Sequence, residues 1–189
     1  MVLRESESEL SEGDRAPPFE LPDVDGEVHS LDSFAEYEAL LLVFTCNHCP
    51  YAKAKFEALN DLAADYDDVA VVGINPNDET EYPDDSTGRM RELVADGRIQ
   101  YDAYLRDENA SVAAAYGAEC TPDPFLFAND DGTFRLRYHG RLDEATNPDD
   151  DPEVPAGEIR TAIDQLLAGE TVTVDPNPSR GCSIKWPDE

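Results

Sequence analysis

Apolar residues along this chain form two kinds of pattern, and their order predicts alternating strands and helices. Residues 40–44 (LLLVF) and 68–75 (DVAVVGIN) are short, almost continuously apolar runs, which are typical of buried strands in a parallel sheet. Between them, from about Pro50 to Tyr66, apolar residues recur every three or four positions, which predicts one amphipathic helix. A helix that joins two parallel strands makes a right-handed βαβ unit. The centre of the chain is therefore expected to be α/β.

Weaker patterns extend this arrangement on both sides. The Asp25-Gly26 turn predicts an N-terminal hairpin. Ser86 is suited to cap a helix that ends near Ala95, and Gly117 is suited to end another helix. The remaining expected elements are a strand at 101–105, a helix at 108–116, a hairpin with strands 125–128 and 134–138, a helix at 156–168 and an extended piece at 171–174.

Charge changes this picture of an ordinary globular domain. The chain has 43 Asp and Glu against 14 Lys and Arg, a formal net charge of −29, and only three of its cations are lysines. The acidic residues occur in every segment beside clear apolar runs, unlike an acidic tail or a disordered chain. Because strong salt screens such self-repulsion, we interpret the surface as that of a halophile's protein. Without a basic patch to neutralise phosphates, nucleic acid is not expected as a partner.

Length and the two ends set the expected organisation. With 189 residues the chain predicts one domain, at 14–175, between a solvated acidic leader at 1–13 and a tail at 176–189. The leader has no apolar signal segment, and no run is long enough to cross a bilayer, so we expect a cytoplasmic protein with no membrane partner. In that compartment four cysteines favour thiol chemistry over a disulfide scaffold.

The most informative motif is Cys46-Asn47-His48-Cys49-Pro50, between the first strand and the helix. If Cys46 lies at the start of the helix, unpaired backbone N–H groups and the helix dipole favour its thiolate, so Cys46 is expected to be the nucleophile. Cys49 would lie one turn further and resolve a mixed disulfide. A protonated His48 would favour the reduced pair. The motif therefore predicts redox chemistry at Cys46 and Cys49.

Metal binding is the alternative for the same residues. Soft thiolates beside an imidazole suit copper(I) or zinc, and the candidate ligands are Cys46, His48 and Cys49, or Cys120. A closed zinc site needs four ligands, and the chain contains no second C-x-x-C or His pair. We therefore expect no metal and no cofactor.

The second informative stretch is Cys120-Thr121-Pro122, where a proline enters an apolar strand. Such a proline is expected at an edge, at a bulge or with a cis bond. Cys120 should face the same surface as Cys46, either as a third redox thiol or as a small buried hydrophobe. Cys182, in the tail, either reaches the active site as an extra resolving thiol or belongs to a segment that simply packs against the domain.

Together these motifs resemble the thioredoxin fold. The C-x-x-C-P motif, its following helix and the later Thr121-Pro122 carry the resemblance. The opening GDRAPPFELPDVDGEVHSLDSF is similar to the redoxin branch, which includes the alkyl hydroperoxide reductase and thiol-specific antioxidant family. The resemblance covers about residues 13–174 and implies a thioredoxin-like mixed sheet flanked by helices, with an N-terminal hairpin extension.

The resemblance also implies roles for single residues. Cys46 corresponds to the nucleophilic cysteine and Cys49 to the resolving one. Pro122 corresponds to the cis-proline that faces the disulfide, and the Thr121 backbone to the strand edge that binds a polypeptide. Thr45 replaces the usual tryptophan. The family pattern also implies a buried acid on the strand before the cysteines, but that strand is wholly apolar here, so the sequence shows no proton acceptor for Cys49.

Two enzymatic hypotheses follow. Peroxiredoxins place a proline seven residues and a threonine or serine three residues before the peroxidatic cysteine. At those distances Leu42 and Cys46 precede Cys49, and Ala39 and Val43 precede Cys46, so neither cysteine fits. We therefore favour a thiol–disulfide oxidoreductase over a thiol peroxidase. The expected partners are a protein or small-molecule disulfide and an electron donor, either a thioredoxin reductase-type enzyme or another thiol.

Overall fold

A five-stranded mixed sheet forms the centre of the molecule. The computed structural model describes residues 2–188, so Met1 of the expected leader and Glu189 of the expected tail lie outside the described residues. The strand order is β6-β5-β4-β8-β9, with β4, β5 and β6 parallel and β8 and β9 antiparallel to their neighbours. The bounds are β4 Ala39–Phe44, β5 Val69–Asn75, β6 Ala103–Arg106, β8 Asp123–Asp130 and β9 Thr133–His139.

The central strand β4 separates two apolar cores. All six of its residues are buried, because both faces of the sheet are covered. Side chains alternate along a strand, so Leu40, Leu42 and Phe44 enter one core and Ala39, Leu41 and Val43 the other. The continuous apolar run in the sequence is the consequence of this double coverage.

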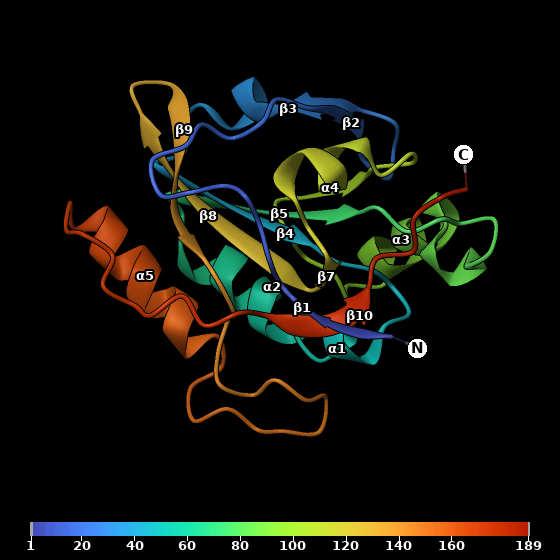
Figure 1. Ribbon diagram of the computed structural model, residues 1–189. Coiled ribbons are helices and arrows are strands. Elements are labelled where there is room, and N and C mark those ends of the chain that lie inside the picture. The colour runs from blue at the N-terminus through green and yellow to red at the C-terminus, as the bar shows by residue number, and fades with distance from the viewer. Residues whose placement is uncertain (1, 189) are drawn as a thin grey trace.

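Helices and a hairpin cover the two faces (Figure 1). α2 Phe56–Asp65 and α5 Gly157–Leu167 pack on one face. On the other lie α4 Ser111–Tyr116, the short 3-10 helix η1 Leu31–Phe34 and the hairpin of β2 Glu20–Pro22 and β3 Val28–Ser30. The N-terminal hairpin and the thioredoxin-like α/β class are therefore confirmed.

Two expected helices differ in detail. The helix expected from Pro50 to Tyr66 is divided into α1 Pro50–Lys53 and α2. The break coincides with Lys55, whose ammonium binds the buried carboxylate of Asp143 at 2.6 Å. The helix expected at 108–116 begins only at Ser111, where the Asp107 carboxylate accepts hydrogen bonds from the first turn.

The remaining elements lie closer to their expected positions. α3 Thr87–Ala95 begins after Ser86, whose hydroxyl accepts a hydrogen bond from the Arg89 N–H, as expected of a capping serine. The 3-10 helix η2 Pro83–Asp85 precedes it. The piece at 171–174 forms no strand. Within the described residues, no helix is long and apolar enough to cross a membrane.

A second, three-stranded sheet joins the two ends of the chain to the domain. Its order is β1 Leu3–Glu5, β10 Arg180–Ser183 and β7 Cys120–Thr121, all antiparallel. Figure 1 shows β1 and β10 lying beside α1. Residues 3–5 of the expected leader thus form a strand, although their side chains are exposed, and residues 180–183 of the expected tail pair with both β1 and β7. Because backbone hydrogen bonds hold β1 and β10 in place, no hydrophobic pattern in the sequence predicts these strands.

Candidate active site

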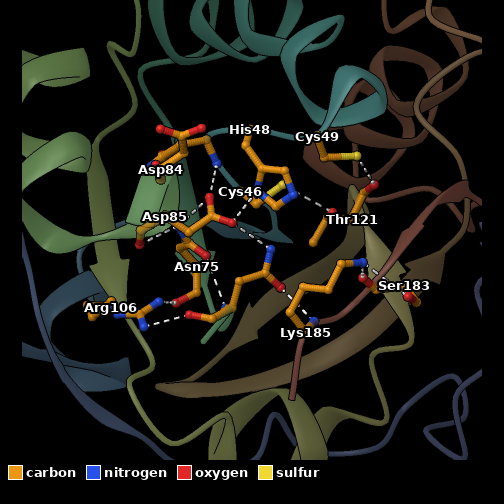
Figure 2. Close-up of polar contacts among 12 residues, drawn as sticks. Cys46, His48, Cys49, Asn75, Asp84, Asp85, Arg106, Thr121, Ser183 and Lys185 are labelled. Carbon is orange, nitrogen blue, oxygen red and sulfur yellow. Dashed lines mark hydrogen bonds and ion pairs between the residues drawn. The ribbon is translucent and has the colours of Figure 1, made fainter. Parts of the chain in front are cut away.

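The two cysteines of the motif lie between β4 and α1 and face Thr121. Neither has exposed surface. The Cys46 sulfur lies 3.4 Å from the Thr121 hydroxyl, and the Cys49 thiol donates to the Thr121 carbonyl oxygen at 3.7 Å (Figure 2). The Thr121–Pro122 peptide bond is cis, as the sequence suggested. The structure thus brings Cys46, Cys49, Thr121 and Pro122 together, although more than seventy residues separate the two motifs.

The helix begins three positions later than a helix-stabilised thiolate at Cys46 would require. Cys49, not Cys46, is the N-cap residue of α1, and Pro50 is its first residue. The positive end of the helix dipole therefore favours a thiolate on Cys49, although this sulfur makes no regular capping hydrogen bond. The condition for a Cys46 thiolate, a place at the helix start, is therefore not met, because residues 46–49 form a bend before the helix.

The electrostatics of the pair follow this geometry. The pKa of Cys49 is lowered to about 5, mainly by a hydrogen bond from the Cys46 thiol. Burial acts against this lowering, and hydrogen bonds from the Cys182 thiol and the Ala52 N–H add to it. Burial raises the pKa of Cys46 well above its ordinary value, with the Cys49 sulfur and the Asp85 charge acting in the same direction. These pKa shifts favour a proton on Cys46 and a negative charge on Cys49, and ionisation of Cys49 removes the hydrogen bond that its thiol donates to Thr121.

His48 forms an ion pair with a buried carboxylate that sequence reasoning missed. Its Nδ1 binds Asp85, and its ring stacks on Tyr82 with centroids 5.4 Å apart. The hydrogen bond to Asp85 raises the pKa of His48, which favours the protonated imidazole. Burial raises the pKa of Asp85, but hydrogen bonds from His48, Asn77 and Asn47 outweigh it and lower the pKa overall.

Three asparagines surround the Asp85 carboxylate. The Asn47 backbone N–H donates to Oδ1 at 2.6 Å, the Asn77 amide to Oδ2 at 2.9 Å and the Asn75 amide to Oδ1 at 3.4 Å. Arg106 holds two of them in place, because its guanidinium donates to the carbonyl oxygens of Asn75 at 3.0 Å and Asn77 at 2.6 Å. A fully buried carboxylate is tolerated here because both of its oxygens accept hydrogen bonds.

The sequence offered little to single out Asp85. It stands in an acidic, proline-containing segment at 76–86 that predicts a loop, among several similar carboxylates. Its neighbour Asp84 is exposed. Only the packing of η2 against the turn that carries Cys46 brings Asp85 inside, and no local pattern encodes that contact.

The two remaining cysteines have different surroundings. Cys182, on β10, pairs with Thr121 and shares a buried cluster with Cys46 and Cys49. Cys120 is also buried, but its thiol faces the carbonyl oxygens of Pro122 at 3.8 Å and Ser179 at 4.0 Å. Burial raises the pKa of Cys120 far above its ordinary value. The sequence suggested that Cys120 faces the same surface as Cys46. In the structure it does not, because neighbouring residues of a strand point in opposite directions.

Donor atoms suited to a metal ion also meet here. Among the described residues, one donor atom each of Cys46, His48 and Asp85 lie within 4.8 Å of one another. Thiolate, imidazole and carboxylate are zinc ligands. In the structure, however, the imidazole and the carboxylate are bound to each other, and Cys49 does not belong to the set. A second such set, Asp23, Glu27 and His29, lies on the N-terminal hairpin.

Comparisons with solved structures place this arrangement among known folds. A hypothetical protein from Sinorhizobium meliloti 1021 is 40% identical over 98% of this chain and 99% of its own, with a TM-score of 0.89. An uncharacterized conserved protein from Geobacillus kaustophilus is 39% identical over 100% of this chain and 98% of its own, with a TM-score of 0.92. A putative thiol:disulfide interchange protein DsbE from Chlorobium tepidum is 22% identical over 85% of this chain and 97% of its own, with a TM-score of 0.59, and shows the fold.

Sequence comparison identifies the family. None of the curated proteins compared with the chain is significantly similar to it. Residues 12–139 match the model of the AhpC/TSA family, and this range contains Cys46, Cys49, Asp85 and the cis peptide before Pro122. The chain therefore belongs to the AhpC/TSA family and has the thioredoxin-like fold that its sequence predicts.

Proposed function

We propose that this protein is a thiol–disulfide oxidoreductase that exchanges electrons through Cys46 and Cys49. The observation that carries the proposal is the contact of both sulfurs with Thr121, at 3.4 Å and 3.7 Å, beside the cis peptide of Pro122. Two thiols three residues apart, one of them with a lowered pKa, form the arrangement that thiol–disulfide exchange requires.

The lowered pKa assigns the steps. The Cys49 thiolate attacks one sulfur of a substrate disulfide, forms a mixed disulfide and releases the first substrate thiolate. The Cys46 sulfur then attacks the Cys49 sulfur, which closes the Cys46–Cys49 disulfide, and the departing second substrate thiolate takes the Cys46 proton. A thioredoxin reductase-type enzyme or another thiol donor returns two electrons to the pair. This order reverses the roles expected from sequence, because Cys49 and not Cys46 is the N-cap residue of α1 and has the lowered pKa.

Asp85 and His48 supply the group that the apolar strand before the motif lacks. Their donor atoms and the Cys46 sulfur lie within 4.8 Å of one another. We assign to the protonated His48, held in place by Asp85, the role of stabilising the negative charge that develops on the Cys46 sulfur when it attacks the mixed disulfide.

The test is rapid mixing of the fully reduced protein, in molar KCl, with a protein disulfide such as insulin. Wild type is expected to react quickly, with a rate that falls as the pH drops through about 5, where the Cys49 thiolate is lost. Cys49→Ser should lower the rate by roughly a hundredfold or more, because a hydroxyl does not replace a thiolate nucleophile. Cys120→Ser is the matched control and should react like wild type.

Hydrogen peroxide separates this proposal from the peroxidase alternative. The same reduced protein is mixed with peroxide, and the cysteine states are determined by intact mass. Slow oxidation by peroxide with fast oxidation by the protein disulfide supports the exchange enzyme. Fast peroxide consumption through a sulfenate, together with a slow disulfide reaction, would overturn it in favour of a thiol peroxidase.

A further inference from the structure

The chain's own C-terminal strand covers the edge of β7 beside the redox pair. Sequence similarity implies that the Thr121 backbone is the edge on which a polypeptide lies. In the structure β10 pairs with that edge in antiparallel register, Cys182 opposite Thr121 and Ser183 opposite Cys120. Figure 1 shows β10 between β7 and β1 and beside α1. A bound polypeptide strand would add to an exposed sheet edge in the same way.

The strand is closely fitted to this position. A Cβ atom on Gly181 would lie 1.9 Å from the Thr121 carbonyl oxygen, so only glycine allows the approach. On one side the Ser179 hydroxyl donates to the Pro122 carbonyl oxygen at 2.6 Å. On the other, the Lys185 N–H donates to the Asn77 amide oxygen at 2.9 Å, which ties the strand to the network around Asp85.

This placement brings the third thiol to the redox pair. Cys182, Cys46 and Cys49 belong to one buried cluster, and the Thr121 carbonyl that Cys49 contacts at 3.7 Å lies directly across from Cys182. Burial and the hydrogen bond to Cys49 raise the pKa of Cys182 to about 12, so it faces the Cys49 thiolate as a protonated thiol. Cys182 thus lies next to Cys49, in the position that a cysteine of a bound substrate polypeptide would occupy on the same sheet edge.

We propose that Cys182 is a third redox thiol of this site, and that it closes a disulfide with Cys49 on a strand that occupies the polypeptide edge. This inference rests on the proposed function. After Cys49 has formed a mixed disulfide with a substrate, the Cys182 sulfur attacks the Cys49 sulfur. The Cys49–Cys182 bond forms, the mixed disulfide breaks, and the departing substrate thiolate takes the Cys182 proton.

Burial of the sulfurs adds a condition for access. Cys46 and Cys49 have no exposed surface, and Cys182 is 3% exposed. An external disulfide therefore reaches Cys49 only when β10 moves away from β7. Return of β10 would then deliver Cys182 to the mixed disulfide, in competition with Cys46.

Removal of Cys46 isolates this reaction. Cys46→Ser, Cys46→Ser/Cys182→Ser and the control Cys46→Ser/Cys120→Ser are each reduced and mixed with oxidised glutathione in molar KCl. Free thiols are then alkylated, and intact mass and disulfide mapping give the products. Circular dichroism verifies that each variant is folded.

The expected products differ sharply. Cys46→Ser and its Cys120 control should lose the glutathione adduct and form a Cys49–Cys182 disulfide. In Cys46→Ser/Cys182→Ser the adduct on Cys49 should last at least about tenfold longer, because no thiol remains beside it. A lasting adduct in Cys46→Ser, with Cys182 alkylated, would overturn the inference while leaving the proposed function intact. If wild type formed neither an adduct nor a disulfide, the proposed function would fail as well.

Discussion

At the scale of single residues, the site depends on a carboxylate that is not part of the cysteine motif. Asp85 is fully buried and accepts hydrogen bonds from His48, Asn77 and the Asn47 backbone. The thioredoxin-like pattern implied an acid on the strand before the cysteines, where this chain has only apolar residues. Here the acid comes from η2, and it contacts His48 of the motif itself.

Asp85→Asn is therefore expected to destabilise the fold by about 2–4 kcal/mol, since an amide group would face donors where a carboxylate accepts. The measurement is urea unfolding in molar KCl, with Asp84→Asn, an exposed neighbour, as the control. The pKa of Asp85 is lowered in the folded protein. Its contribution to the free energy of unfolding is therefore fully present above pH 3.8, the pKa of the unfolded chain, and is lost as the pH falls through the lower pKa of the folded state. The pKa of His48 is raised in the folded protein. Its contribution to the free energy of unfolding is therefore fully present below pH 6.5, the pKa of the unfolded chain, and is lost as the pH rises through the higher pKa of the folded state.

The difference between wild type and Asp85→Asn should accordingly be largest between pH 3.8 and 6.5. A difference that does not vary with pH would show that the carboxylate acts only by packing. Equal loss in the Asp84 variant would contradict a specific role for Asp85.

At the scale of secondary-structure elements, sequence patterns located most strands and helices but not their partners. The strands at β4 and β5 and the hairpin of β8 and β9 follow from apolar runs and turn residues, which are local signals. The start of α1 at Pro50 was predicted correctly, but its separation from α2 was not, because Lys55 at the break binds Asp143, which lies far along the chain. The pairing of β10 with β7 was not foreseen, since it joins segments about sixty residues apart through backbone atoms.

The close approach of β10 gives a direct prediction for Gly181→Ala. The added Cβ would collide with the Thr121 carbonyl oxygen, so β10 should lift from β7 and expose Cys182. Alkylation of Cys182 in the native reduced protein should become about tenfold faster or more, as local opening becomes easier. Peptide mass mapping after a timed pulse of iodoacetamide gives the rate.

Gly88→Ala is the matched control for this substitution. Its Cβ would meet only the Ser86 hydroxyl, at 3.8 Å, in helix α3. In the Gly88→Ala variant, iodoacetamide should alkylate Cys182 at the wild-type rate. Unchanged alkylation in Gly181→Ala would mean that β10 accommodates the methyl group without leaving its place.

At the scale of the whole molecule, acidic residues far outnumber basic ones, and three of the cations hold interior groups or a strand end in place. Lys55 binds the buried Asp143, and the nearly buried Arg106 positions the asparagines around Asp85. Lys185 donates to Ser183 at the end of β10. Against a formal net charge of −29, these contacts leave most carboxylates without a cationic partner. We expect dissolved salt to limit their mutual repulsion.

The free energy of unfolding should rise with salt. Between about 0.1 M and about 1 M KCl the Debye length falls from about 10 Å to about 3 Å, which screens the surface carboxylates from one another. We expect a gain of at least about 1 kcal/mol over this range, measured by urea unfolding at constant pH. Sucrose, which does not screen charge, is the control. Stability that is independent of KCl would contradict the interpretation of the surface as adapted to strong salt.

The sequence by itself determined most elements of the central domain, the cysteine pair and the Thr121-Pro122 entry to β8, because periodicity and motif spacing are local properties of the chain. Tertiary structure alone decided what surrounds the pair. It brought Asp85 to His48, turned Cys120 away and placed Cys182 beside Cys49. It also moved the favoured thiolate from Cys46 to Cys49, through the start of α1 and the burial of Cys46. Burial, charge and backbone pairing arise only when distant segments meet, so no stretch of sequence contains them.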